Sequence, residues 1–169
     1  LSYYKANYLI QWFWPVYGDF VLMLRGDMGY AAGYGGKPLP FYKVFYGGGV
    51  GSVRGYETAT LGPRDLAGNP LGGERKVIGN AELFYPLLKG DKSVRGSVFV
   101  DAGQISGVPG LGATAASLEK DNEKFRFSYG VGLAWNSPVG PLKFSYAWPI
   151  KKYPGDRLEA FQFQVGSVF

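Results

Sequence analysis

The sequence predicts an all-β protein, an antiparallel transmembrane β-barrel region of about seven strands. Seven segments alternate between apolar and polar positions, and none has the periodicity of an amphipathic helix. One face of each segment is large and often aromatic, whereas the other is polar or small. Short connections alternate strictly with long ones, as they do in outer-membrane barrels. A soluble sandwich, with its apolar face inward and a charged face outward, is the less favoured alternative.

The first three expected strands are residues 4–14, 20–30 and 76–85. Their apolar faces carry Tyr4, Ala6, Tyr8, Ile10, Trp12 and Trp14, then Phe20, Leu22, Leu24, Met28 and Tyr30, then Val77, Ala81, Leu83 and Tyr85. Their polar faces carry Lys5, Asn7 and Gln11, then Arg25 and Asp27, then Asn80 and Glu82. Each strand has about the ten residues that cross a bilayer when tilted.

The remaining expected strands are residues 94–104, 125–135, 142–148 and 158–169. Segment 125–135 is the clearest, because its odd-numbered positions are all large and apolar and its even-numbered positions, from Arg126 to Ala134, are polar or small. Aromatic residues gather near strand ends, as in the girdles of membrane barrels: Trp12, Trp14, Tyr30, Tyr85, Trp135 and Trp148.

The connections indicate how the chain is oriented. Residues 15–19, 86–92 and 136–141 are short turns, whereas 31–75, 105–123 and 149–157 are long loops. Short turns are typical of the periplasmic side, which puts the chain's end in the periplasm and its start at the outer face. Complete bacterial barrels have an even number of strands. We therefore expect this chain to be part of a larger barrel, or to close by associating with another chain.

Composition excludes several classes of function. The chain has no Cys and no His, which removes thiolate and imidazole metal ligands, disulfides and a His-dependent catalytic triad. The net charge is +5, but the cations are scattered and form no basic stripe, so nucleic-acid binding is not expected. No apolar run approaches the ~20 residues of a transmembrane helix.

A glycine-rich stretch around Arg54 is the strongest local signal. Five glycines between residues 47 and 55 flank this arginine within the long loop. Glycine allows close backbone approach, and an arginine in a packed place needs an acidic partner. Glu82 and Asp101 lie mid-strand on polar faces of neighbouring strands and are the candidate partners. The alternative, that Arg54 is an exposed loop cation and both acids are solvated, stays open from spacing alone.

The residues Val53-Arg54-Gly55-Tyr56 resemble the Val-Arg-Gly-Phe/Tyr signature of the BamA superfamily, the barrel-assembly and two-partner-secretion proteins of outer membranes. The resemblance is closer to the barrel-assembly members and runs in order along nearly the whole chain. It includes residues 40–42, 45–48, 81–83, 99–103, 135–142, 144–147, 149–153 and 161–166.

The resemblance implies a 16-stranded barrel preceded by periplasmic POTRA domains, of which this chain would be the last seven strands. Residues 1–169 would form a single partial barrel domain, without POTRA domains, whose loop 31–75 folds into the lumen. Arg54 would pair with Asp101 and Glu82, near Gly103. Phe169 resembles the terminal aromatic signal of outer-membrane barrels.

The resemblance also implies a function, as part of an outer-membrane insertase for β-barrel proteins. Its partners would be outer-membrane lipid, unfolded barrel clients, assembly lipoproteins, POTRA domains and the missing strands. A weak seam would lie at the last strand, where Gly166 either allows a kink or merely fits a crowded lumen. No cofactor or metal is expected.

Two other functions are weighed. A two-partner-secretion or passive channel would share the fold and the arginine loop. A barrel enzyme would have to use Asp101 and Glu82 as a carboxylate pair, because the usual His base is missing. A nucleotide site is excluded, since Arg54 stands where a dinucleotide fingerprint needs glycine.

Overall fold

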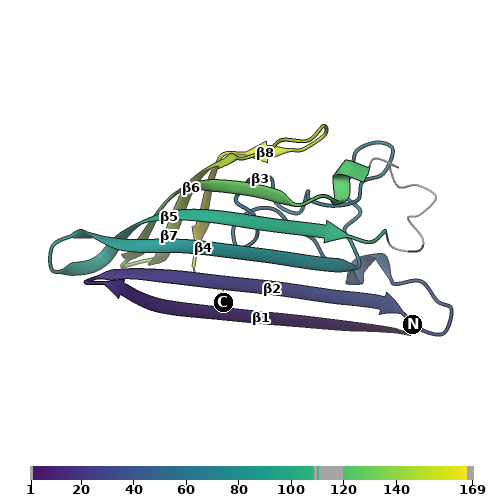
Figure 1. Cartoon of the computed structure of the whole chain (residues 1–169), viewed down its shortest axis with the longest axis horizontal. Helices are drawn as coiled ribbons and strands as arrows, with labels where there is room; N and C mark the ends of the chain where they lie inside the picture. The colour runs from purple at the N-terminus through teal and green to yellow at the C-terminus, as the bar shows by residue number, and fades with distance from the viewer. Residues whose placement is uncertain (1, 109, 111–119, 167–169) are drawn as a thin grey trace.

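The computed structural model describes residues 2–108, 110 and 120–166, and these form a curved antiparallel sheet (Figure 1). Within these residues the sheet has seven strands in the order β1-β2-β4-β5-β6-β7-β9, so that each strand lies beside its neighbour along the meander. The strands are β1 (Tyr3–Tyr17), β2 (Phe20–Gly33), β4 (Arg75–Leu88), β5 (Asp91–Ser106), β6 (Arg126–Ser137), β7 (Gly140–Pro149) and β9 (Phe161–Val165). The predicted fold class is confirmed.

A second, small sheet joins two loops. It pairs β3 (Gly55–Tyr56) with β8 (Leu158–Glu159), and no sequence pattern predicted it. Two 3-10 helices, η1 (Phe41–Lys43) and η2 (Lys120–Glu123), complete the elements of the described residues. In the described part of the chain, no helix is long and apolar enough to cross a membrane.

Most strands are longer than expected, and the turns are correspondingly shorter. The predicted turns 15–19, 86–92 and 136–141 reduce to two residues each: Gly18–Asp19, Lys89–Gly90 and Pro138–Val139. Pro15 and Pro86, which suggested turns, lie inside β1 and β4 beside register shifts. A bulge tolerates proline because the ladder there is already interrupted.

Alternation along the strands separates an exposed face from a buried one. In β5, Val98 and Val100 are 44% and 50% exposed, whereas Phe99 and Asp101 between and after them are buried. In β6, the aromatic and aliphatic positions from Phe127 to Trp135 are all exposed. The large apolar side chains therefore cover the convex face of the sheet, as the sequence predicted.

The concave face is less polar than expected. Leu9 and Phe13 of β1 and Met23 of β2 lie on the same face as Gln11 and Glu82. The sequence pattern placed Lys5, Asn7 and Gln11 on this face. Leu9 and Phe13 continue the same alternation, but the prediction did not include them. The concave wall near the short turns of β1 and β2 is consequently partly apolar.

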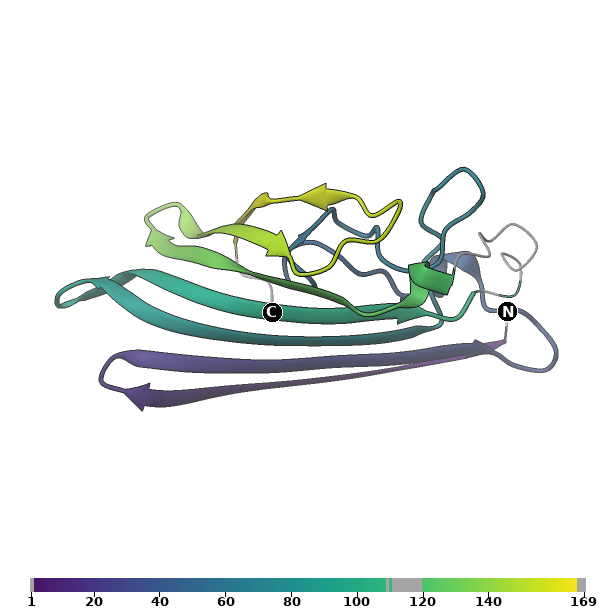
Figure 2. The same ribbon diagram turned by 45° about the horizontal axis from the view of Figure 1, so that its top comes forward.

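The long loop between β2 and β4 lies inside the curve of the sheet (Figure 2). Its apolar residues pack against β2 and β5 in a buried cluster. The cluster comprises Ala31, Leu39, Val44, Phe45, Val53, Tyr56, Leu61 and Ile105. The protein's core therefore lies between loop and wall, on the concave side.

The last predicted strand, 158–169, is divided. Residues 158–159 form β8 and pair with the loop, whereas only Phe161–Val165 join the main sheet as β9. Gly166 follows β9 with φ +92°, rather than lying within the strand as predicted. Its amide donates to the Pro141 carbonyl at 2.8 Å, so it ends the ladder. Phe169 lies outside the described residues.

Candidate functional site

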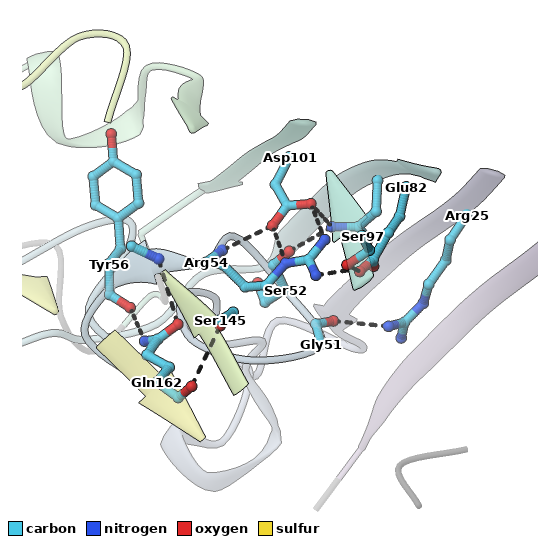
Figure 3. A network of polar contacts seen from close by, with 12 residues as sticks. Arg25, Gly51, Ser52, Arg54, Tyr56, Glu82, Ser97, Asp101, Ser145 and Gln162 are labelled. Atoms are coloured by element: carbon cyan, nitrogen blue, oxygen red, sulfur yellow. Dashed lines mark hydrogen bonds and ion pairs between the residues drawn. The ribbon is translucent and has the colours of Figure 1, made fainter. Parts of the chain in front are cut away.

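The guanidinium of Arg54 lies between two carboxylates on the concave wall (Figure 3). Its Nε and Nη2 donate to Oδ2 and Oδ1 of Asp101 at 2.7 and 2.8 Å, a bidentate pair. Its Nη1 donates to Oε2 of Glu82 at 2.9 Å. The Arg54 side chain is 11% exposed and that of Asp101 is fully buried. The geometry is that of strong, charge-assisted hydrogen bonds.

Strand register brings the two acids to one place. Asp101 of β5 lies opposite Asn80 of β4, and Glu82 lies opposite Phe99, so both carboxylates project from adjacent strands. Asn80 donates to Asp101 at 2.9 Å, and the Ser97 hydroxyl donates to Glu82 at 2.6 Å. Each acid is thus oriented by a neighbouring polar side chain.

Phe99 forms the floor under the guanidinium. The Arg54 Cζ lies 3.4 Å from the centre of the Phe99 ring, a stacked cation–π contact. Glycines of β6 leave room for this ring and its neighbours. A Cβ at Gly130 would come within 2.6 Å of the Phe99 ring, and one at Gly132 within 2.5 Å of the Ser97 hydroxyl.

The backbone of the loop is fixed at the same point. The Arg54 amide donates to Asp101 at 3.0 Å, and Asn80 donates to the Ser52 carbonyl at 2.7 Å. Arg25 of β2 donates to the Gly51 carbonyl at 3.0 Å. Val53 packs on Gly103 of β5, where an added Cβ would lie 2.4 Å from a Val53 methyl group. The missing side chain at Gly103 therefore leaves the space that Val53 of the loop fills; we call this position the seat of the loop.

Gly55 and Tyr56 face the opposite side of the curve, toward the end of the chain. They pair with Glu159 and Leu158 of β8. Gly55 has φ +89°, and a Cβ there would lie 3.1 Å from that of Ala147 on β7. Tyr56 is fully buried and its hydroxyl donates to the Lys151 carbonyl at 3.2 Å. The four motif residues, 53–56, therefore contact both walls.

The loop setting changes how two motif residues titrate. Burial alone would lower the pKa of Arg54, but its hydrogen bond to Asp101 and the charges of both acids raise it above the usual value. Burial, followed by the charge of Asp156, raises the pKa of Tyr56 to about 12. Arg54 is thus charged and Tyr56 neutral throughout the physiological range.

A second buried ionic cluster was not foreseen. Asp156, in the loop before β8, accepts from Arg126 of β6 at 2.9 Å through both oxygens and from Arg64 of the long loop at 3.1 Å. The Tyr153 amide also donates to Asp156, at 3.0 Å. Arg64 and Arg126 are buried. Arg126, at an inward position of β6, was a sequence signal for a buried ion pair. Its partner Asp156 could not be identified, because it lies in a loop without a periodic pattern.

The hydrogen bonds fix Arg54 and occupy the two carboxylates that could act as an acid or a base. Each carboxylate oxygen of Asp101 and Glu82 accepts at least one hydrogen bond from Arg54, Asn80 or Ser97. Among the residues that the structure describes, no group of three or more carboxylates comes together as a metal site would require. These contacts hold the long loop between β2 and β4 against the concave face of β4 and β5.

Comparison with known proteins gives the chain its family. Residues 1–169 match the Omp85 superfamily domain. The outer membrane protein assembly factor BamA of Neisseria meningitidis serogroup B is 42% identical over 194 residues, covering 100% of this chain and 24% of that protein. The sorting and assembly machinery component 50 homolog B of Xenopus laevis is 29% identical, covering 100% of this chain and 38% of its own length.

A solved structure agrees with these sequences. The crystal structure of BamA from Haemophilus ducreyi lacking POTRA domains 1–3 superposes with a TM-score of 0.84 at 33% identity, covering 96% of this chain and 34% of that one. The chain thus spans about a quarter to a third of the length of these two bacterial relatives. The predicted resemblance to the C-terminal part of a BamA barrel is confirmed, and the location is the bacterial outer membrane. The chain belongs to the Omp85 superfamily.

Proposed function

We propose that this chain is the C-terminal barrel region of an insertase that folds β-barrel proteins into the outer membrane. The observation that carries the proposal is the clamp on Arg54, held by Asp101 and Glu82 at 2.7 and 2.9 Å in a chain whose relatives are assembly factors. The clamp anchors loop 31–75 inside the barrel and keeps the concave wall in shape.

The proposed seam lies at β9. This strand has five residues, whereas β1, β2, β4 and β5 have 14 to 16, and in the described residues its outer edge pairs with no other strand. A short edge strand makes few ladder hydrogen bonds and can exchange partners. Gly166, directly after it, has φ +92°, a backbone conformation outside the strand region. An incoming client strand would add to this edge.

The partners follow from the same proposal. The convex aromatic face meets outer-membrane lipid, and the edges of β1 and β9 meet the missing strands of the barrel. Unfolded β-barrel proteins are the clients, and barrel-assembly lipoproteins and POTRA domains are the accessory parts. The proposal assigns no enzymatic role, and the hydrogen bonds that Asp101 and Glu82 accept from Arg54, Asn80 and Ser97 support a structural use of these carboxylates.

Replacing Arg54 tests the clamp. In the intact barrel that contains this region, Arg54→Ala leaves Asp101 and Glu82 buried without their guanidinium, a loss of about 3–5 kcal/mol for a buried pair. We expect slower assembly of porins, measured by their folded fraction in isolated outer membranes. Arg157→Ala is the matched control, because Arg157 is an exposed loop arginine whose side chain donates to the Gly68 carbonyl at 3.3 Å. Normal growth with normal porin levels in Arg54→Ala would contradict the role.

Charge reversal tests direct pairing. Arg54→Asp or Asp101→Arg alone places like charges together, whereas the double variant restores opposite charges. We expect the double variant to recover part of the porin assembly that either single variant loses, because Glu82 and Asn80 remain arranged for the original polarity. Secretion of one dedicated substrate, with porins unaffected, would instead favour a two-partner-secretion channel.

A further inference from the structure

The backbone of the arginine motif is bound by the last strand of the sheet. The Gln162 side chain of β9 donates through Nε2 to the Tyr56 carbonyl at 2.9 Å and accepts from the Gly55 amide at 3.4 Å (Figure 3). Gln162 is 5% exposed. Its amide group thus binds the loop as a neighbouring strand's backbone would, and continues the pairing that β8 begins.

The two sides of the motif are one residue apart. Arg54 is fixed to β4 and β5 through its side chain and its amide, while the next residue, Gly55, is fixed to β8 and β9. The amide of Glu57 adds a further bond, to the Arg157 carbonyl at 3.0 Å. A displacement of β9 away from the sheet must either break the two bonds from Gln162 or pull the motif from its acids.

We propose that Gln162 is a positioning residue that couples docking of the arginine loop to the position of the terminal strand. The motif then acts as a strut between the β4–β5 wall and β9. Energetic coupling between two sites is reciprocal. Weakening the attachment of the motif to β9 should therefore weaken its attachment to β4 and β5, and the reverse should also hold. The biological meaning rests on the proposed seam at β9, whereas the coupling itself is a property of the barrel.

Gln164 provides the matched control. It lies two residues along β9 on the same face, where it pairs across from Lys143 of β7 rather than against the motif. Gln162→Leu and Gln164→Leu therefore make the same chemical change on the same strand. Gln162→Glu is the second test variant, because it keeps the shape and the acceptor for Gly55 but replaces the donor to the Tyr56 carbonyl and the Glu159 carboxylate, at 2.9 and 3.2 Å, with a carboxylate oxygen.

Amide hydrogen exchange in the intact barrel, folded in detergent, measures the coupling. With Gln162→Leu we expect exchange about tenfold faster at the amides of Gly55 and Glu57, and also at the Arg54 amide, which is bound to Asp101 on the other wall. Gln162→Glu should give a change of the same kind and at least as large, because its carboxylate repels the Tyr56 carbonyl and Glu159. Gln164→Leu should leave these amides unchanged.

The reciprocal experiment decides whether the strut transmits. Arg54→Ala should accelerate exchange at the Ala147 amide, which pairs with the Ala160 carbonyl beside β9 at 2.9 Å. An effect of Gln162→Leu confined to Gly55 and Glu57, or an equal effect of Gln164→Leu, would overturn the proposal. Coupled exchange without any assembly defect in Arg54→Ala would leave the coupling intact and refute the insertase role instead.

Discussion

Arg54 is held by shape as well as by charge. Its planar fork meets Asp101 with two parallel bonds, turns its remaining nitrogen to Glu82 and lies flat on Phe99. A lysine carries the same charge on a single rotatable ammonium and can reproduce neither the fork nor the stacking. The residue type at position 54 is therefore dictated by three contacts at once.

The seat at Gly103 gives a prediction at the scale of one methyl group. Gly103→Ala pushes its Cβ to 2.4 Å from a Val53 methyl, so we expect the loop docking to weaken by about 1–3 kcal/mol, as for other overpacked sites. Limited proteolysis of loop 31–75 in the folded barrel measures the change. Val53→Ala in the same chain should restore part of the protection, because it removes the methyl that clashes.

Gly79→Ala is the control for Gly103→Ala. Gly79 lies mid-strand in β4, and a Cβ there meets nothing within 4 Å. Loop protection should stay at the original level in this variant. Equal proteolysis of the two variants would show that a strand glycine, rather than the seat, is what matters.

Tyr56 gives a prediction about alkaline pH. Its pKa is raised from 10.0 to about 12 in the folded loop, so burial disfavours the tyrosinate. The stability that neutral Tyr56 contributes is complete below about pH 10 and is lost as the pH rises through about 12. Loop protection in the native barrel should fall over this window, and Tyr56→Phe should fall less. An identical alkaline profile for both proteins would contradict the assignment.

The sequence singled out Arg54, Glu82 and Asp101 as candidates because they are charges at inward or glycine-flanked positions where charges are few; spacing left their pairing open, and the family resemblance implied it. The structure places the atoms at hydrogen-bonding distance. Gln162 could not be singled out, since an inward glutamine looks like any wet lumenal residue until its backbone partners are known. The same holds for Asp156, whose loop has no periodic pattern.

At the scale of elements, alternation predicted the strands because each has a convex face that must be large and apolar. It could not predict where they end. Pro15 and Pro86 read as turn residues, yet both lie in strands next to bulges, where no ladder donor is missed. The sequence could not predict the pairing of β3 with β8, because a strand of two residues is too short to show an alternating pattern.

The Asp156 cluster ties together three elements that are distant in sequence. Asp156→Ala removes the carboxylate from the buried side chains of Arg64 and Arg126, which should cost about 3–5 kcal/mol. We expect loops 31–75 and 149–157 to lose protection together, measured by hydrogen exchange. The Arg54 clamp should weaken less, because it bonds to different strands.

A surface pair supplies the contrast for the Asp156 variant. Asp19 meets Lys92 at 3.4 Å with both side chains more than half exposed. Asp19→Ala should change stability by about 1 kcal/mol or less. If Asp156→Ala were equally mild, the cluster would not be holding the loops.

At the scale of the whole molecule, the described sheet ends at β1 on one side and β9 on the other. Lipid cannot satisfy the free backbone groups of such edges, so the sheet requires further strands to close it. The Neisseria and Haemophilus relatives, of which this chain covers 24% and 34%, fit this requirement. The loop packed in the curve explains why the sheet keeps its shape: it fills the concave side with a core of its own.

The span of chain between bonded partners sets an order of folding events. Arg54 and Asp101 are 47 residues apart, whereas Gln162 and the motif backbone are more than 100 apart. Contacts that enclose longer stretches of chain form later, because more conformational freedom must be lost first. We therefore expect the loop to dock on β4 and β5 before β9 joins the sheet, and the bonds from Gln162 to form last, so that their formation marks the completed barrel wall.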